Sequence, residues 1–327
     1  MILLTGATGM VGRQVAELLL ARGTAVTALV RDPGPAGPLA ALGARLVTGS
    51  VAEAGAWQRV DGVGAIVHCA AIISGGRGWE SYAGANIRAT AHAARRAREL
   101  GIPLVQLSSV AVYGGASTAP AGTVDESFRF APLRPGNWYG RSKREAEEAV
   151  WREAAAGLRA IALRPCVIYG PYDRHFFPAI LRKARSGRLP LVGPGDRPMA
   201  LVHARSVAEA VLAALDAGAG WGRAYNVTGD APIAPRDLVA ALGRGLGRPI
   251  RSRRLPEGPM LALARAADGV TRFILPAGAF PGDLTTAVAY WRGGDPYRAD
   301  LIRRDLGWAP RIDHAAEIER LARGSPE

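Results

Sequence analysis

A tyrosine and a lysine four positions apart are the side chains of this sequence best suited to move a proton. They stand in the run Tyr139-Gly140-Arg141-Ser142-Lys143. On a helix, residues at this spacing lie on one face, so the phenol and the ammonium can reach the same ligand. The ordinary pKa of a tyrosine is about 10, and a nearby ammonium lowers that pKa because it favours the phenolate. Tyr139 is therefore a candidate acid or base, with an ordinary amphipathic helix as the competing interpretation.

A second hydroxyl group follows the apolar run Pro103–Leu107. Ser108 and Ser109 come directly after this run, which we predict to be a buried strand. A serine at such a strand end points into the cleft above the sheet, where it can donate to a substrate oxygen as negative charge develops. A serine that only caps a turn is the alternative, and it fits Ser108 better than Ser109. We predict Ser109, Tyr139 and Lys143 as the catalytic residues.

A glycine-rich turn near the amino terminus is suited to bind a phosphorylated ligand. The segment Thr5–Gly12 lies between an apolar run and a helical pattern. Glycine permits close backbone approach, and the free N–H groups at a helix start attract a pyrophosphate. A strand before and a helix after are the context that a dinucleotide-binding fingerprint requires. We predict contacts to a dinucleotide from Gly6, Thr8, Gly9, Met10, Val11 and Gly12.

The end of the second apolar run bears on which dinucleotide is bound. An NAD site places a carboxylate there, which binds the ribose 2′-hydroxyl. This run ends Leu29-Val30-Arg31 instead, and the Arg31 guanidinium suits a 2′-phosphate. Asp32 would either repel that phosphate or cap the turn at Pro33. We expect NADP, with NAD as the alternative, and we include Arg31 among the cofactor-binding residues.

Apolar runs alternating with helical patterns position these groups. We predict strands over Met1–Leu4, Ala25–Val30, Ala44–Val47, Gly64–Val67, Pro103–Leu107, Leu158–Leu163 and Ala224–Val227, and helices over Val11–Leu20, Asn86–Leu100, Tyr139–Ala156 and Ser206–Ala217. This order is typical of an α/β protein with a doubly wound parallel Rossmann sheet. We expect a dinucleotide-binding domain over residues 1–165, to which 199–228 return. A smaller C-terminal substrate lobe would comprise 166–198 and 229–327.

Composition argues against several other classes of protein. Hydrophobic residues make up 49% of the 327 residues and charged residues 21%, as in a globular protein. The net charge of +13 suits an anionic ligand. Because the basic residues are scattered without a nucleic-acid motif, we expect no nucleic-acid partner. No apolar run approaches about 18 residues and no signal peptide opens the chain, so we expect no membrane partner and a cytoplasmic location. Cys69 and Cys166 lack partners at metal spacing, and we expect no metal.

Together these motifs resemble those of the extended short-chain dehydrogenase/reductase family, also called the NAD-dependent epimerase/dehydratase family. The matching segments run in family order over nearly the whole chain: Thr5–Gly12, His68–Ala71, Asn86–Thr90, Ser108–Gly114, Tyr139–Lys143, Leu163–Pro165, Ile168–Pro171, Leu201–His203, Tyr225–Val227 and Asp305–Trp308. No single segment is specific for this family, whereas the occurrence of all of them in this order is. The resemblance implies Tyr139 as acid or base, Lys143 as a ligand of the nicotinamide ribose, and Ser109 as a donor to the substrate oxygen.

The resemblance also implies further contacts to the cofactor. They would come from Ala70, Ala71, Pro165 and Val167, and from Tyr139 and Lys143 themselves. Ser50 and Val51 stand where members usually carry an Asp, which contacts adenine, before an apolar residue. We retain both as adenine contacts, with Ser50 as a departure from the family pattern. The turn 29–33 resembles that of dihydroflavonol-reductase-type members, which use NADPH.

Two departures favour a reductase of apolar substrates within the family. Sugar-nucleotide members usually carry an Arg-Asp pair where this chain has Met199-Ala200, and dehydratases place acidic residues where it has Val110-Ala111. We therefore expect a 3β-hydroxysteroid-dehydrogenase-like enzyme that moves hydride between nicotinamide and the carbinol or carbonyl carbon of a small, largely apolar molecule. The alternatives are a nucleotide-sugar epimerase or dehydratase with tightly held NAD, and a catalytically silent NADP-sensing protein. Members often dimerise through the helices at Asn86 and Tyr139, and we expect a homodimer.

Overall fold

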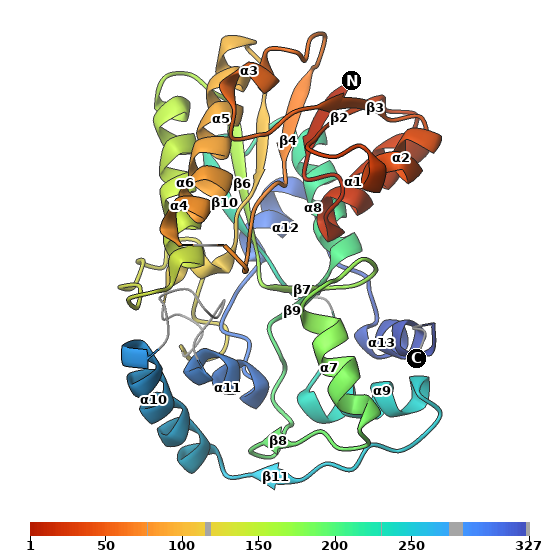
Figure 1. Cartoon of the computed structure of the whole chain (residues 1–327), viewed down its shortest axis with the longest axis vertical. Coiled ribbons are helices and arrows are strands. Elements are labelled where there is room, and N and C mark those ends of the chain that lie inside the picture. The colour runs from red at the N-terminus through yellow and green to blue at the C-terminus, as the bar shows by residue number, and fades with distance from the viewer. Residues whose placement is uncertain (77, 115–118, 230, 275–283, 325–327) are drawn as a thin grey trace.

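Seven parallel strands form the central sheet of the protein (Figure 1). The computed structural model describes residues 1–76, 78–114, 119–229, 231–274 and 284–324. In chain order the strands are β1 (Ile2–Thr5), β2 (Val26–Val30), β3 (Arg45–Thr48), β4 (Ala65–His68), β5 (Leu104–Leu107), β6 (Ala160–Pro165) and β10 (Arg223–Val227). Their order across the sheet is β10-β6-β5-β4-β1-β2-β3. The α/β class and the doubly wound parallel sheet expected from the sequence are confirmed.

The register of the strands brings their carboxyl ends to one edge of the sheet. Thr5 at the end of β1 is opposite Leu29 of β2 on one side and His68 of β4 on the other. The chain order of the strands reverses between β1 and β4. In open parallel sheets a crevice forms at the carboxyl edge beside such a reversal, and ligands bind there.

Helices cover both faces of this sheet (Figure 1). On one face α1 (Met10–Ala21) packs against α8 (Ala204–Asp216), and on the other α5 (Ala89–Glu99) packs against α6 (Trp138–Ala155). Apart from the edge strands β3 and β10, which are partly exposed, the strands are almost wholly buried, and this explains their continuous apolar runs. Short elements complete this part: η1 (Gly34–Ala36), α2 (Gly37–Ala41), α3 (Ala54–Trp57), α4 (Trp79–Tyr82), the π-helical η2 (Ala83–Arg88) and the 3₁₀ turn η3 (Val110–Tyr113).

The rest of the chain builds a second hydrophobic core beyond the carboxyl edge. Two small parallel sheets pair β7 (Val167–Tyr169) with β9 (Leu201–His203), and β8 (Leu191–Val192) with β11 (Arg254–Leu255). Five helices accompany them: α7 (Phe176–Arg185), α9 (Pro235–Gly245), α10 (Glu257–Ile274), α11 (Leu284–Arg292) and α13 (His314–Arg323). Tyr169, Leu181, Leu242 and Ile318 are among the buried residues of this core. We refer to these elements as the appended part.

One late segment returns to the sheet. Helix α12 (Asp300–Leu306) packs against the edge strand β10. Just after it, Trp308 is buried, and its Nε1 donates to the Ser206 carbonyl oxygen of α8 at 3.0 Å. A search of the described helices for one with the length and apolarity to cross a bilayer finds none.

Candidate active site

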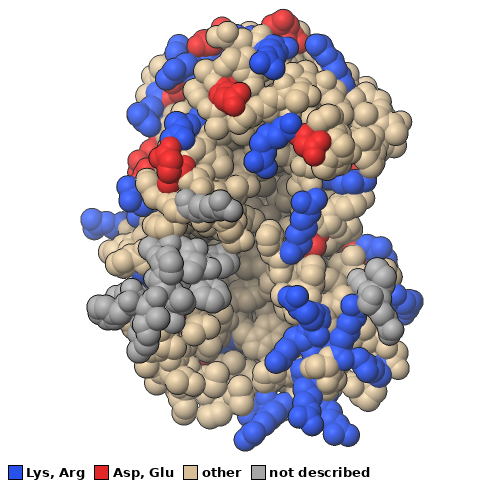
Figure 2. Space-filling model, viewed as in Figure 1, with Lys and Arg blue, Asp and Glu red and all other residues tan. Residues whose placement is uncertain are grey.

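The carboxyl edge of the sheet collects the polar residues that the sequence analysis selected. Gly6 follows β1, Arg31 follows β2, and Ser109 lies two residues beyond the end of β5. Helix α6 brings Tyr139 and Lys143 to the same edge, because the Lys143 Nζ donates to the Leu107 carbonyl oxygen at the end of β5, at 2.6 Å. The molecular surface is hollowed between the sheet and the appended part, in front of this edge (Figure 2).

The glycine turn after β1 packs closely against the end of β4 and the start of α1 because Gly6 and Gly12 have no side chains. Gly6 has a φ of +70°, and a Cβ on it would lie 2.6 Å from the Ala70 backbone nitrogen. A Cβ on Gly12 would collide with the carbonyl oxygen of Gly6. These contacts hold α1 tightly against the ends of β1 and β4. Within the described chain no side chain caps the first N–H groups of α1, and its first turn holds no acidic residue. The turn therefore fits a pyrophosphate.

The end of β2 carries one basic and one acidic side chain, Arg31 and Asp32. Arg31 is exposed and forms no ion pair with another described residue. The Asp32 Oδ1 accepts a hydrogen bond from the Gly34 backbone N–H at 2.9 Å. The carboxylate thus caps its own turn, which was one of the two roles considered for it. Arg31 is consequently the one guanidinium directly at the end of this strand.

The remaining residues proposed to contact the cofactor lie at the ends of β3, β4 and β6. The Ser50 Oγ accepts from the Ala52 N–H at 3.3 Å, and the Val51 carbonyl accepts from the Trp57 Nε1 at 2.9 Å. Ser50 is thus held in a local turn after β3. The remaining positions follow β4 or end β6 and start β7, namely Ala70, Ala71, Pro165 and Val167.

Ser109 and Tyr139 meet directly. A hydrogen bond links the hydroxyl groups of Ser109 and Tyr139, and the Ser109 Oγ accepts from the Ala111 N–H at 3.1 Å. Ser109 is the residue that caps the η3 turn. The capping role and the proposed catalytic role, which the sequence analysis treated as alternatives, therefore involve the same side chain.

The pKa of Tyr139 moves in the direction opposite to the one expected. Burial raises the pKa of this phenol, and the Ser109 hydrogen bond opposes that effect. The charge of Lys143, whose ammonium donates to the Leu107 carbonyl oxygen, is not among the causes of the shift. Burial lowers the pKa of Lys143 itself to about 8, against the attraction of Glu147 and Cys69. The phenol is thus a protonated acid at neutral pH.

A buried ion pair that the sequence analysis missed lies one helical turn beyond Lys143, next to the proposed catalytic residues. Glu147 and Arg164 are 2% and 5% exposed, and two hydrogen bonds of 2.6 and 2.9 Å join them. Glu147 also accepts from the Ser108 hydroxyl, and Arg164 donates to the Tyr113 phenol at 2.9 Å. The pair joins α6, β6 and the segment after β5. A signal existed in the sequence, since Tyr139, Lys143 and Glu147 follow one another at helical spacing.

Asn86 is a second residue to which the sequence analysis gave no role. It lies in the π-helical segment η2, and its Nδ2 donates to the Ser142 Oγ at 2.8 Å. Its Oδ1 and Nδ2 also bond the backbone N–H and carbonyl of Ile72. Asn86 therefore connects the loop after β4 to the residue next to Lys143. Short π-helical segments inside helices often occur at functional sites.

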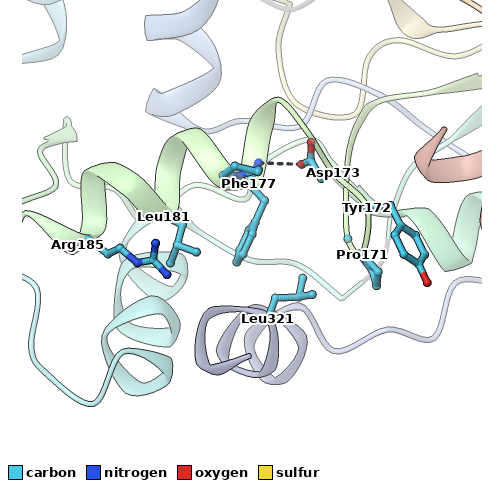
Figure 3. Close-up of a pocket in the computed structure, with 9 residues that line it drawn as sticks. Pro171, Tyr172, Asp173, Phe177, Leu181, Arg185 and Leu321 are labelled. Atoms are coloured by element: carbon cyan, nitrogen blue, oxygen red, sulfur yellow. Dashed lines mark hydrogen bonds between the residues drawn. The ribbon is translucent and has the colours of Figure 1, made fainter. Parts of the chain in front are cut away.

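A separate surface pocket of about 300 Å³ lies away from these residues (Figure 3). Phe177 and Leu181 of α7 and Leu321 of α13 form its apolar wall. The Asp173 carboxylate at its rim is occupied by the backbone N–H groups of residues 175–177. None of the proposed catalytic residues lines this pocket, and we do not regard it as the active site.

Comparison with known proteins shows which family this arrangement belongs to. The model of the NAD dependent epimerase/dehydratase family matches residues 2–228. A 4-hydroxy-2-methyl-3-oxo-4-farnesyl-3,4-dihydroquinoline-1-oxide ketoreductase of Stigmatella aurantiaca is 29% identical and covers 98% of this chain and 96% of its own. A 2-alkyl-3-oxoalkanoate reductase of Stenotrophomonas maltophilia is 29% identical, with 99% of each chain covered. Sterol demethylase protein B of Methylococcus capsulatus is 28% identical, with 98% and 97% covered.

Solved structures show the same fold over the whole chain. The crystal structure of gox2253 superposes with a TM-score of 0.78 at 27% identity and covers 98% of this chain and 97% of its own. The UDP-glucuronic acid 4-epimerase of Bacillus cereus, in complex with NAD, has a TM-score of 0.73 at 17% identity, with 97% and 96% covered. With the family model matched over more than half of its length, this chain belongs to the NAD dependent epimerase/dehydratase family and is an NAD(P)-dependent oxidoreductase of the extended short-chain dehydrogenase/reductase type.

Proposed function

We propose that the protein is an NADPH-dependent ketoreductase that acts on a largely apolar small molecule. One observation carries this proposal: the hydroxyl groups of Ser109 and Tyr139 are hydrogen-bonded, and Lys143 reaches the same strand end, at the sheet edge that holds the glycine turn of Gly6. A proton donor, a second hydroxyl and an ammonium thus converge at the edge where a dinucleotide fits.

The residues divide the reaction as follows. NADPH, when bound, would supply the hydride that the carbonyl carbon receives. Tyr139 gives its proton to the carbonyl oxygen, which becomes the hydroxyl of the product. Ser109 stabilises the developing negative charge by a hydrogen bond. Lys143 would hold the ribose of the cofactor, and a proton from solvent restores the phenol.

The choice of NADP over NAD is supported by the end of β2. Arg31 is exposed there, and Asp32 is engaged with Gly34. A guanidinium binds a phosphate with two parallel, charge-assisted hydrogen bonds. NAD sites use a carboxylate to bind the ribose 2′-hydroxyl. Because Asp32 is engaged with Gly34, such a carboxylate would have to come from another part of the chain.

An apolar substrate is supported by two buried residues. Met199 and Ala200 are 4% and 6% exposed. They occupy the positions where sugar-nucleotide members carry the Arg-Asp pair, so the chain lacks that clamp for a diphosphate. Three similar enzymes are named for a farnesyl quinoline oxide, an alkyl oxoalkanoate and a sterol, all with large apolar portions.

A nucleotide-sugar epimerase with tightly bound NAD is the second candidate. Similar proteins include an N-acetyl-alpha-D-glucosaminyl-diphospho-ditrans,octacis-undecaprenol 4-epimerase of Escherichia coli O157:H7, and the Bacillus cereus epimerase binds NAD in its crystal structure. An epimerase returns the hydride to its substrate, so it consumes no cofactor overall. Net oxidation of the cofactor therefore separates the two candidates.

The experiment uses the purified full chain with NADPH and a panel of ketones. The panel includes a steroid ketone, a long-chain β-keto acid and a 4-keto sugar nucleotide. We expect the absorbance of NADPH to fall with an apolar ketone and to stay constant with the sugar nucleotide. Copurified NAD with sugar interconversion would favour the epimerase, and cofactor binding without any turnover would favour the sensing protein.

A further inference from the structure

The positive charge of this protein is concentrated in two segments of the appended part. Residues 174–195 and 238–256 contain no Asp or Glu and together hold ten of the 41 Lys and Arg residues. The rest of the chain has 31 basic residues against 28 acidic ones. Most of the net charge of +13 therefore comes from these segments. The net charge is thus unevenly distributed along the sequence, although the basic residues themselves are spread over the whole chain.

The fold brings the two segments side by side. Arg188 and Arg251 form a parallel β-bridge, and β8 pairs with β11 directly after them. Six exposed cations result: Arg182, Lys183, Arg188, Arg251, Arg253 and Arg254. None of the six forms an ion pair with another described residue. We call these six residues the basic face, and Figure 2 shows Lys and Arg gathered, without acidic residues among them, over α7 and the chain near β11.

Helix α10 adds exposed apolar side chains directly after the basic face in the chain. It begins at Glu257, three residues after Arg254. Leu263 of α10 is 64% exposed, the largest value among the large hydrophobic residues whose exposure the structure describes, and Leu284 of the adjacent α11 is 50% exposed. Ala262 and Ala266 of α10 are exposed as well. In the view of Figures 1 and 2, α10 and the basic face lie on opposite sides of the hollow, at the same end of the molecule.

We propose that this end of the molecule docks on an anionic membrane surface, with the basic face against lipid headgroups and α10 at the level of the acyl chains. Amphipathic helices bind bilayers through exposed apolar residues, and nearby Lys and Arg add attraction to anionic lipid. The sequence analysis expected no membrane partner because it found no spanning segment, and peripheral docking needs none. The docking rests on the proposed function in one respect: an apolar ketone partitions into bilayers, so an enzyme at the surface meets its substrate there.

The surroundings of the basic face favour lipid over nucleic acid. Single-stranded nucleic acids are bound by aromatic side chains on which bases stack. The aromatic residues of α7 are used internally, since Phe176 packs against Tyr290 and Phe177 against Tyr169. Exposed leucines such as Leu263 would not contribute to binding a phosphate backbone, whereas their transfer from water into a bilayer is favourable.

The test is cosedimentation of the full chain with vesicles. Phosphatidylcholine vesicles are compared with vesicles that also contain phosphatidylglycerol, at low and high salt. We expect binding to the anionic vesicles that weakens with salt. The triple variant Arg251→Glu/Arg253→Glu/Arg254→Glu should bind them about tenfold more weakly or worse, and Leu263→Gln should bind several-fold more weakly.

A matched control separates location from total charge. The variant Arg59→Glu/Arg152→Glu/Arg311→Glu changes three exposed arginines elsewhere by the same charge and should bind like the parent. Equal losses in the two triple variants, equal binding to neutral vesicles, or binding only to a nucleic-acid duplex would overturn the proposal. Turnover of a water-soluble ketone is measured in parallel. Failure of turnover in every protein would contradict the proposed function, while the vesicle result still decides the docking.

Discussion

The carboxyl edge of the sheet and the appended part achieve their organisation by different means. At the edge, Gly6, Arg31 and Ser109 follow three different parallel strands whose register brings their carboxyl ends together, and α6 adds Tyr139 and Lys143 there. The appended part has two-stranded sheets and helices whose connections are long, such as the one that leads from α9 to β11. The difference teaches that the regular sheet positions the residues proposed for the chemistry, whereas the substrate choice and membrane docking that we propose would depend on the less regular part.

Replacing the proposed acid at the carboxyl edge should have the largest effect of the changes considered, and this effect should be on turnover. In Tyr139→Phe we expect turnover to fall about 10²- to 10⁴-fold, because the proton donor is lost. NADPH binding should be nearly unchanged, since the glycine turn is intact. Steady-state kinetics and fluorescence titration measure the two quantities. Tyr172→Phe, at a 43% exposed tyrosine of the appended part, is the control, and equal turnover in both variants would refute the assignment.

Breaking the buried ion pair should have the next largest effect, on stability. Glu147→Gln leaves Arg164 charged and buried, and we expect a loss of about 3–5 kcal/mol in the free energy of unfolding. Glu209→Gln breaks the exposed Arg205–Glu209 pair instead and should cost about 0–1 kcal/mol. Urea unfolding measures both values. The double variant Glu147→Leu/Arg164→Met should recover part of the loss, and similar losses from the two glutamine variants would show that burial of the pair is unimportant.

Removing the guanidinium after β2 should change cofactor preference. In Arg31→Ala we expect NADPH binding to weaken by about 1.5–3 kcal/mol, the usual contribution of a hydrogen bond to a charged group. NADH binding serves as the internal control and should stay constant. Titration calorimetry with both cofactors gives the ratio. An unchanged preference would mean that another residue recognises the 2′-phosphate or that the protein uses NAD.

The smallest effects concern two buried phenols, one in each region. The Tyr113 Oη bonds Arg164 and Asn226, whereas the Tyr290 Oη on α11 is buried without a hydrogen-bond partner among the described residues. We expect Tyr113→Phe to cost about 1–3 kcal/mol and Tyr290→Phe to cost nothing, because only the first removes satisfied bonds. Thermal unfolding compares them. A larger loss from Tyr290→Phe would contradict this reading of the appended part.

The sheet could be predicted from sequence because its strands are buried on both faces. Continuous apolar runs such as those at β2 and β4 mark them within one or two residues. Helix α6 was equally clear from its spacing. The π-helical segment that contains Asn86 could not be predicted, because its sequence does not differ from that of an ordinary α-helix in any recognisable pattern.

The appended part and the pKa of Tyr139 show where sequence reasoning ended. Helices α7, α9 and α13 were not predicted, although each has apolar residues at helical spacing, such as Leu238, Val239 and Leu242 of α9. Glu147 resembled a surface glutamate of an amphipathic helix, because its partner Arg164 is distant in the chain and only the fold brings them together. The direction of the Tyr139 pKa shift depends on burial, which spacing does not encode.

Transfer of deuterium tests the central claim most directly. The full chain is incubated with an apolar ketone and NADPH that carries deuterium at the transferred position, and the product is analysed by mass spectrometry. The account predicts one deuterium at the new carbinol carbon, with one NADPH oxidised for each alcohol formed. Label that stays in the cofactor, or product formed without net oxidation of NADPH, would contradict it.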